Sequence, residues 1–154
     1  MSYLDFSPTV SIKGVVIVDD HVILLQNERG EWELPGGKPE PDETPEDTVA
    51  REISEELDMS VTVGGIVDTW IYEVRTGVTV LVVTYRCSPL ITTRVSDLHL
   101  SHEHSRLGVF GALDLANIRL PLGYLRSIVR ATGWPIEHQV GRGLSELTSN
   151  GKAG

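Results

Sequence analysis

A proline- and glycine-rich stretch between a strand-like region and an acidic helix constrains this chain most. Residues 35–47 read PGGKPEPDETPED and contain four prolines and two adjacent glycines. Proline lacks an amide hydrogen, and glycine adopts main-chain conformations that other residues avoid, so most of this stretch cannot form regular structure. We therefore expect a shaped loop that the elements on both sides hold in place.

The regions around this loop predict a mixed sheet with helices. Between residues 13 and 34, the apolar runs GVVIV and VILLQ flank DDH and precede EWEL, which indicates strand, hairpin, strand, turn and strand. Residues 61–75 and 78–87 are rich in β-branched side chains and are separated by TG, which predicts a long hairpin. A short strand is expected at 107–110. A late helix follows, with one apolar side formed by Leu122, Leu125, Ile128 and Val129. This order predicts an α/β fold with helices on the faces of the sheet.

Length and charge limit the classes of function. The 154 residues suit one domain, which we place at 1–140, followed by a small, polar and flexible tail at 141–154. The formal charge of −9 disfavours binding to nucleic acid or to an anionic membrane, so an anionic substrate would need a local cation. Because no signal peptide or long apolar run is found, we expect a cytoplasmic protein. The single cysteine, Cys87, lies in a strand-like run and is expected to be buried.

The helix expected after the loop concentrates carboxylates. It should run over 45–57, with Thr44 as its N-cap. At about 100° per residue, Glu52, Glu55 and Glu56 fall on one face. The adjacent stripe is apolar and can pack on a sheet: Val49, Ala50, Ile53 and Leu57. A solvated acidic surface is one explanation, and a binding site for Mg²⁺, which prefers oxygen ligands, is the other.

The segment GKPEPDETPEDTVAREISEELDM, residues 37–59, resembles the Nudix box, which is the signature of the Nudix hydrolases and is written G-x5-E-x7-R-E-U-x-E-E-x-G-U with U apolar. The fixed polar positions that match are Gly37, Glu43, Arg51, Glu52, Glu55 and Glu56. One fixed position departs, because Asp58 replaces the glycine that normally ends the helix in a left-handed conformation. Aspartate tolerates that conformation, so we expect a cost of about 1 kcal/mol and no loss of metal ligands. The resemblance covers residues 10–132 and implies a Nudix-type α/β/α sandwich, in which the box helix and a C-terminal helix pack on a mixed sheet.

Nudix hydrolases use Mg²⁺ or Mn²⁺ to cleave the pyrophosphate bond of a nucleoside diphosphate linked to another group. The resemblance implies this chemistry here. The metal ligands that it implies are Glu52, Glu55, Glu56 and the carbonyl oxygen of Gly36. Arg51 would orient the carboxylates through Glu55 or through Glu43. The general base stays open between a box glutamate and Glu103, a loop residue that could also bind the metal.

The sequence indicates substrate contacts less specifically. Arg29 and Lys38 could bind phosphate, and Trp32, Phe110, Tyr72 and Trp70 could stack on a base. An exposed turn arginine and ordinary core aromatics are the alternatives for these positions.

The substrate itself is weakly indicated. ADP-ribose is the best expectation, followed by other nucleoside diphosphate sugars and nucleoside triphosphates. Residues 75–77 read RTG and lack the proline or tyrosine that marks some Nudix subgroups. A monomer or a homodimer that binds a small nucleoside diphosphate derivative is expected.

Two other classes of function compete. A Nudix-fold sensor would bind a nucleotide without cleaving it, although the complete set of box glutamates disfavours that reading. An isomerase of the same superfamily would need a cysteine nucleophile in its pocket, and Cys87 is alone in a strand.

Overall fold

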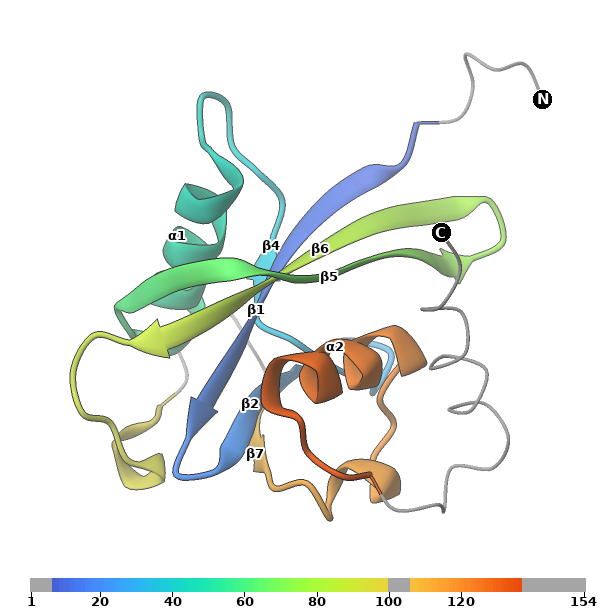
Figure 1. Ribbon diagram of the computed structural model, residues 1–154. Helices are drawn as coiled ribbons and strands as arrows, with labels where there is room; N and C mark the ends of the chain where they lie inside the picture. The colour runs from blue at the N-terminus through green and yellow to red at the C-terminus, as the bar shows by residue number, and fades with distance from the viewer. Residues whose placement is uncertain (1–6, 100–105, 137–154) are drawn as a thin grey trace, which may run out of the picture.

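The computed structural model describes residues 7–99 and 106–136 and confirms a mixed sheet with two α-helices (Figure 1). The strands are β1 (Thr9–Val18), β2 (His21–Gln26), β3 (Trp32–Glu33), β4 (Gly36–Gly37), β5 (Val61–Arg75), β6 (Val78–Pro89) and β7 (Leu107–Phe110). The helices are α1 (Pro45–Leu57) and α2 (Leu122–Thr132), with single 3₁₀ turns at Val95–Asp97 and Leu115–Asn117. None of the helices in these two ranges is long and apolar enough to cross a membrane.

Strand β1 connects the parts of the sheet, whose order is β3-β2-β1-β6-β5. It runs parallel to β6 from Thr9 to Val16, and its far end pairs with β2 in a tight antiparallel hairpin. The two residues of β4 pair with β1 through Ile12↔Gly37 and Lys13↔Gly36. The sequence predicted only a loop there, because a two-residue strand has no periodicity of its own and depends on β1 for its hydrogen bonds.

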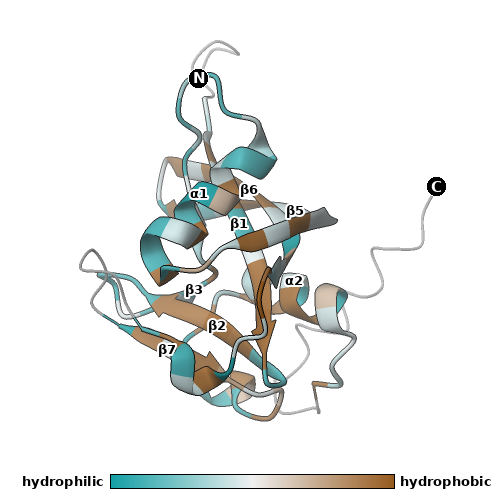
Figure 2. Cartoon of the chain, turned by 90° about the vertical axis from the view of Figure 1, so that its left-hand side faces the viewer, coloured by the Kyte–Doolittle hydropathy of each residue, from teal (hydrophilic) through white to brown (hydrophobic). Residues whose placement is uncertain are grey.

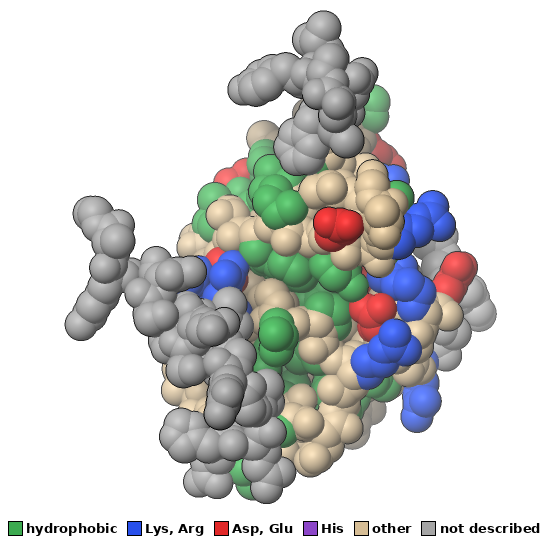
Figure 3. All heavy atoms as spheres, turned by 90° about the vertical axis from the view of Figure 1, so that its right-hand side faces the viewer, with side chains coloured by type: hydrophobic (Ala, Val, Ile, Leu, Met, Phe, Trp, Pro, Cys, Tyr) green, Lys and Arg blue, Asp and Glu red, His purple; other side chains and the backbone are tan. Residues whose placement is uncertain are grey.

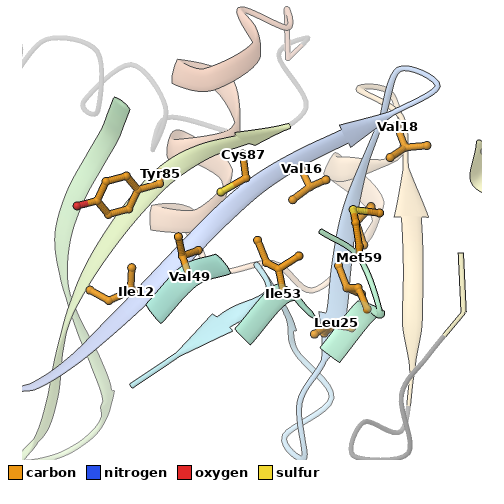
Figure 4. Packing of buried hydrophobic residues seen from close by; sticks show 11 residues of the cluster. Ile12, Val16, Val18, Leu25, Val49, Ile53, Met59, Tyr85 and Cys87 are labelled. Carbon is orange, nitrogen blue, oxygen red and sulfur yellow. The ribbon is translucent and has the colours of Figure 1, made fainter. Parts of the chain in front are cut away.

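The two helices cover opposite faces of the sheet and enclose two apolar cores. On one face, Val49 and Ile53 of α1 lie against Ile12 and Val16 of β1 (Figure 4). On the other face, α2 contributes Tyr124, Leu125 and Ile128 to a second core. Figure 2 shows hydrophobic colouring along β2 and β7 and hydrophilic residues along α1. The stripe predicted for the box helix is therefore the surface that fixes the helix to the sheet.

The predicted start of α1 is confirmed. Thr44 is the N-cap, and its hydroxyl accepts a hydrogen bond from the amide of Asp47 at 3.1 Å. The Asp47 carboxylate accepts a hydrogen bond from the amide of Thr44 in return, which completes a capping box. At the other end, Asp58 adopts the expected left-handed conformation, with φ 50° and ψ 43°. The box helix thus has a defined position at both ends.

A buried carboxylate attaches α2 to β5. The side chain of Asp68 is fully buried and accepts two hydrogen bonds from Arg126, at 2.9 and 3.0 Å. Arg130 donates a third at 2.6 Å, and the Ser127 hydroxyl donates a fourth at 2.8 Å. In contrast to the prediction, Leu122 at the start of α2 is 46 % exposed. The sequence analysis did not identify the Asp68 cluster.

Cys87 is buried in the core under α1, as predicted (Figure 4). Burial raises the pKa of its thiol to about 12, which leaves little thiolate near neutral pH. We expect the native protein to react with a thiol reagent at pH 8 at least about a hundredfold more slowly than the guanidinium-unfolded chain. Comparable rates in the two states would show that this part of the core opens readily.

Candidate active site

The glycines of β4 bring the loop close to the sheet. Gly36 has φ +138°, and a Cβ there would lie 2.0 Å from the carbonyl oxygen of Ile12. A Cβ on Gly37 would come within 2.5 Å of the Glu52 carboxylate. A larger residue at position 36 would meet the backbone of β1 in a left-handed conformation, so this position requires glycine, whereas one at position 37 would displace the Glu52 carboxylate.

Glu56 is the most buried carboxylate of the box. It is 3 % exposed, and its Oε1 accepts a hydrogen bond from the amide of Gly36 at 2.9 Å. Burial raises its pKa to about 8, while the charge of Lys13 and the Gly36 amide act in the opposite direction. A carboxylate held in this way can accept a cation without changing its position.

Arg51 sits at the centre of the remaining carboxylates. Its guanidinium binds both oxygens of Glu43, at 2.6 and 3.0 Å, and contacts Glu52 at 3.1 Å and Glu55 at 3.2 Å. The hydrogen bonds from Arg51, helped by the amide of Glu40, lower the pKa of Glu43 to about 2. Arg51 makes both contacts that the sequence offered as alternatives, and it offsets the repulsion among these carboxylates.

The box carboxylates differ in exposure and partners. The side chains of Glu52 and Glu55 are 19 % and 49 % exposed and both bind Arg51, whereas Glu56 faces Gly36. Within residues 7–99 and 106–136, no three acidic, histidine or cysteine side chains converge as a ready-made metal site. The donor types nevertheless fit Mg²⁺ or Mn²⁺, which prefer carboxylate and carbonyl oxygens. Glu56 binds the amide of Gly36, and the carbonyl oxygen of the same residue lies 3.4 Å from the Lys13 ammonium.

A groove runs beside this site on the α2 face of the sheet. It encloses about 200 Å³, and its lining includes three basic side chains from β1 and the loops, Lys13, Arg29 and Lys38. Tyr72 and Tyr124 form its aromatic wall. Figure 3 shows Lys and Arg side chains gathered beside apolar ones on the face at the right of Figure 1. The acidic chain therefore has the local positive charge that an anionic ligand needs.

A larger cavity of about 450 Å³ continues past Tyr72 and is lined by Glu31, Trp70 and Arg119, among others. Glu31 joins the two spaces, because it accepts a hydrogen bond from the Tyr72 hydroxyl at 2.8 Å and one from Arg29 at 3.3 Å. The two cavities together offer a charged compartment beside the box and an aromatic one beyond it.

The structure separates the predicted substrate contacts into two groups. Arg29 and Lys38 line the groove. Trp32 is 8 % exposed and packs edge to face against Phe110, with ring centres 4.8 Å apart, in the core under α2. Base stacking by these two aromatic residues stays a prediction, and their position is that of core side chains.

Sequence analysis missed Lys13 and Tyr124. Lys13 alternates with Ser11 and Val15 along β1 and faces the same side of the sheet, so the one charged residue on that side of the strand was the available signal. Tyr124 belongs to a helical apolar pattern, and nothing in that pattern distinguishes a groove residue from a core residue.

Comparison with known proteins identifies the family. The family model described as NUDIX domain matches residues 8–121. The chain belongs to the Nudix family. A MutT-like protein of Streptomyces ambofaciens is 44 % identical over 84 residues, which are 53 % of this chain and 52 % of the relative. This match therefore spans about half the length of that relative. The CTP pyrophosphohydrolase of Escherichia coli (strain K12) is 33 % identical over 107 residues, which are 64 % and 73 % of the two chains.

The solved structure of a MutT protein from Methanosarcina mazei Go1 has the same fold as this Nudix protein. The two align with a TM-score of 0.63 and 28 % identity, over 79 % of this chain and 91 % of that one. The α/β/α sandwich implied by the box is therefore the fold of this chain.

Some predicted residues of this Nudix protein lie outside the described residues. They are Glu103 and the tail at 141–154. The choice of general base between Glu103 and a box glutamate therefore stays open.

Asp58, which replaces the second box glycine, has a partner. Its carboxylate lies 3.1 Å from Nε2 of His99, and this contact raises the pKa of the imidazole. The substitution thus connects the end of the box helix to the segment after β6.

Proposed function

We propose that this protein is a metal-dependent hydrolase that cleaves the pyrophosphate bond of a nucleoside diphosphate derivative. Water attacks one phosphorus, the anhydride P–O bond breaks, and the leaving phosphate departs with the bond electrons. The observation that carries this proposal is the buried Glu56 on Gly36, next to a groove that contains three basic side chains.

In this proposal some residues bind the metal or the phosphates, and others hold the metal-binding carboxylates in position. Glu56, Glu52, Glu55 and the Gly36 carbonyl would hold Mg²⁺ or Mn²⁺. When bound, the ion supplies charge screening, polarises phosphoryl oxygens and lowers the pKa of bound water. Arg51 holds the Glu52 and Glu55 carboxylates, and Glu43 fixes Arg51. Arg29 and Lys38, which line the groove, can bind the diphosphate. The proton of the attacking water passes to Glu103 or to a box glutamate.

Two classes of nucleotide are candidates for the substrate. ADP-ribose was the best expectation from the sequence. The relative described as a CTP pyrophosphohydrolase favours a nucleoside triphosphate equally. The aromatic cavity beyond Tyr72 suits a base or a ribose in either case.

Purified protein with Mg²⁺ or Mn²⁺ should hydrolyse at least one member of a panel containing ADP-ribose, sugar nucleotides, CTP and the deoxynucleoside triphosphates. Product masses identify the bond that breaks, and reaction in ¹⁸O-labelled water shows which phosphate receives the new oxygen. Added EDTA should stop turnover. Tight nucleotide binding without turnover on the whole panel would instead favour the alternative, a nucleotide-binding sensor.

A further inference from the structure

Lys13 is a charged residue at a position where strands usually carry apolar side chains. Its side chain is 7 % exposed, and β1 is paired with β6 on one side and with β4 on the other at this residue. The backbone therefore cannot move to expose the ammonium. A buried ammonium needs oxygen partners, so it lies where oxygen atoms provide negative potential.

The partners of Lys13 belong to the proposed metal site on one side and to the groove on the other. Its Nζ lies 3.4 Å from the Gly36 carbonyl oxygen, which is long for a hydrogen bond. It lies 3.8 Å from Oε1 of Glu33, which lines the groove. The ammonium thus has one weak contact with a carbonyl oxygen of the box loop and one carboxylate, that of Glu33, within ion-pair distance.

A bound divalent ion and this ammonium would compete for the same place. Mg²⁺ requires oxygens at about 2.0–2.1 Å, and a dication beside an ammonium is strongly repelled in a desolvated site. A lysine side chain is flexible enough to swing its head while the backbone stays fixed.

We propose that the Lys13 ammonium takes the place of a cation at the Gly36 carbonyl oxygen in the metal-free protein, and that metal binding moves it away from Gly36 into a closer contact with Glu33 in the groove. There it adds to the charge of Arg29 and Lys38 facing a bound phosphate. Lys13 would then weaken metal binding to the free protein and strengthen nucleotide binding to the metal-loaded protein. The effect on nucleotide binding rests on the proposed function, whereas the effect on metal affinity concerns metal binding alone.

The test is Mn²⁺ affinity without nucleotide, measured from the electron paramagnetic resonance signal of free Mn²⁺. Lys13→Gln should bind Mn²⁺ about tenfold more tightly than the wild type, because a nearby positive charge has been removed. Lys13→Arg keeps the charge and should stay closer to the wild type. Arg75→Gln changes the net charge equally at an exposed residue where the β5–β6 turn begins, and should have no effect. Lys13→Met is a second neutral variant, whose apolar side chain suits a buried position.

For nucleotide binding to the metal-loaded protein, the same substitution should change the affinity in the opposite direction. At saturating Mn²⁺, Lys13→Gln should bind the non-hydrolysable probe α,β-methylene ADP about tenfold more weakly than the wild type. Both neutral variants should keep the far-ultraviolet circular dichroism of the wild type.

Two results would overturn the inference. Unchanged or weaker Mn²⁺ binding by both neutral variants, with normal binding by the wild type, would make Lys13 a structural counter-ion and leave the proposed function intact. Absence of Mn²⁺ binding in every protein would overturn the metal-dependent function together with the displacement.

Discussion

Glu56→Gln should lower hydrolysis by about a thousandfold while the fold is kept. The amide has nearly the same shape and can still accept the hydrogen bond from the Gly36 amide, but it cannot offer a negative charge to a metal. Loss of one charged ligand in a buried site removes much of the stabilisation of the transition-state charge. The measurement is kcat and KM on the best substrate of the panel.

The same substitution should change how stability depends on pH. The pKa of Glu56 in the folded protein is about 8, above its ordinary value of 4.5, so the folded state binds more protons than the unfolded state between these two values. Without metal, wild-type stability should therefore fall as pH rises through this window. Glu56→Gln lacks the titrating group and should be more stable than the wild type by of order 2–4 kcal/mol at pH 8.5, with little difference near pH 4.

Urea unfolding in EDTA at both pH values measures this difference. Glu73→Gln, at an exposed position on β5, is the matched control for activity and for stability. Near wild-type turnover of Glu56→Gln would refute the proposed role of the box carboxylate. An equal pH dependence of stability in the two proteins would show that the pKa of Glu56 in the folded protein is close to its ordinary value.

Asp68→Ala should destabilise the protein by about 3–5 kcal/mol, because it leaves two arginines and a serine hydroxyl without their shared acceptor. For a chain of this length, this corresponds to a fall in Tm of roughly 10 °C. The loss should concentrate at the contact between β5 and α2, where Gly123 packs directly on Trp70. Thermal and urea unfolding measure the effect.

Asp68→Asn separates charge from shape, because it keeps the size of the side chain and removes the negative charge. It should also destabilise the protein, by less than Asp68→Ala. Glu73→Ala removes a charge from an exposed position of the same strand and should stay within about 0.5 kcal/mol of the wild type. A loss below about 1 kcal/mol for Asp68→Ala would show that the cluster is replaceable by solvent.

Sequence patterns predicted those parts of the structure that depend on interactions between residues close together in the chain. Thr44 at the start of the helix and the apolar stripe of Val49 and Ile53 were foreseen, because capping and helical spacing depend on residues three or four positions apart. The long β5–β6 hairpin followed from two β-branched runs around a short turn. The fixed offsets of the box identified the family and indicated the carboxylates that we propose for the metal site.

The sequence by itself thus determined the family, the order of the main elements and which carboxylates share one face of the box helix. Tertiary structure alone decided that Glu56 is buried while Glu55 is half exposed, although both are glutamates of one helix. It also placed Lys13 against Gly36, 23 residues away, and Asp68 against Arg126, 58 residues away. Burial and long-range charge pairing depend on how separate elements pack on the sheet, and no spacing along the chain records that packing.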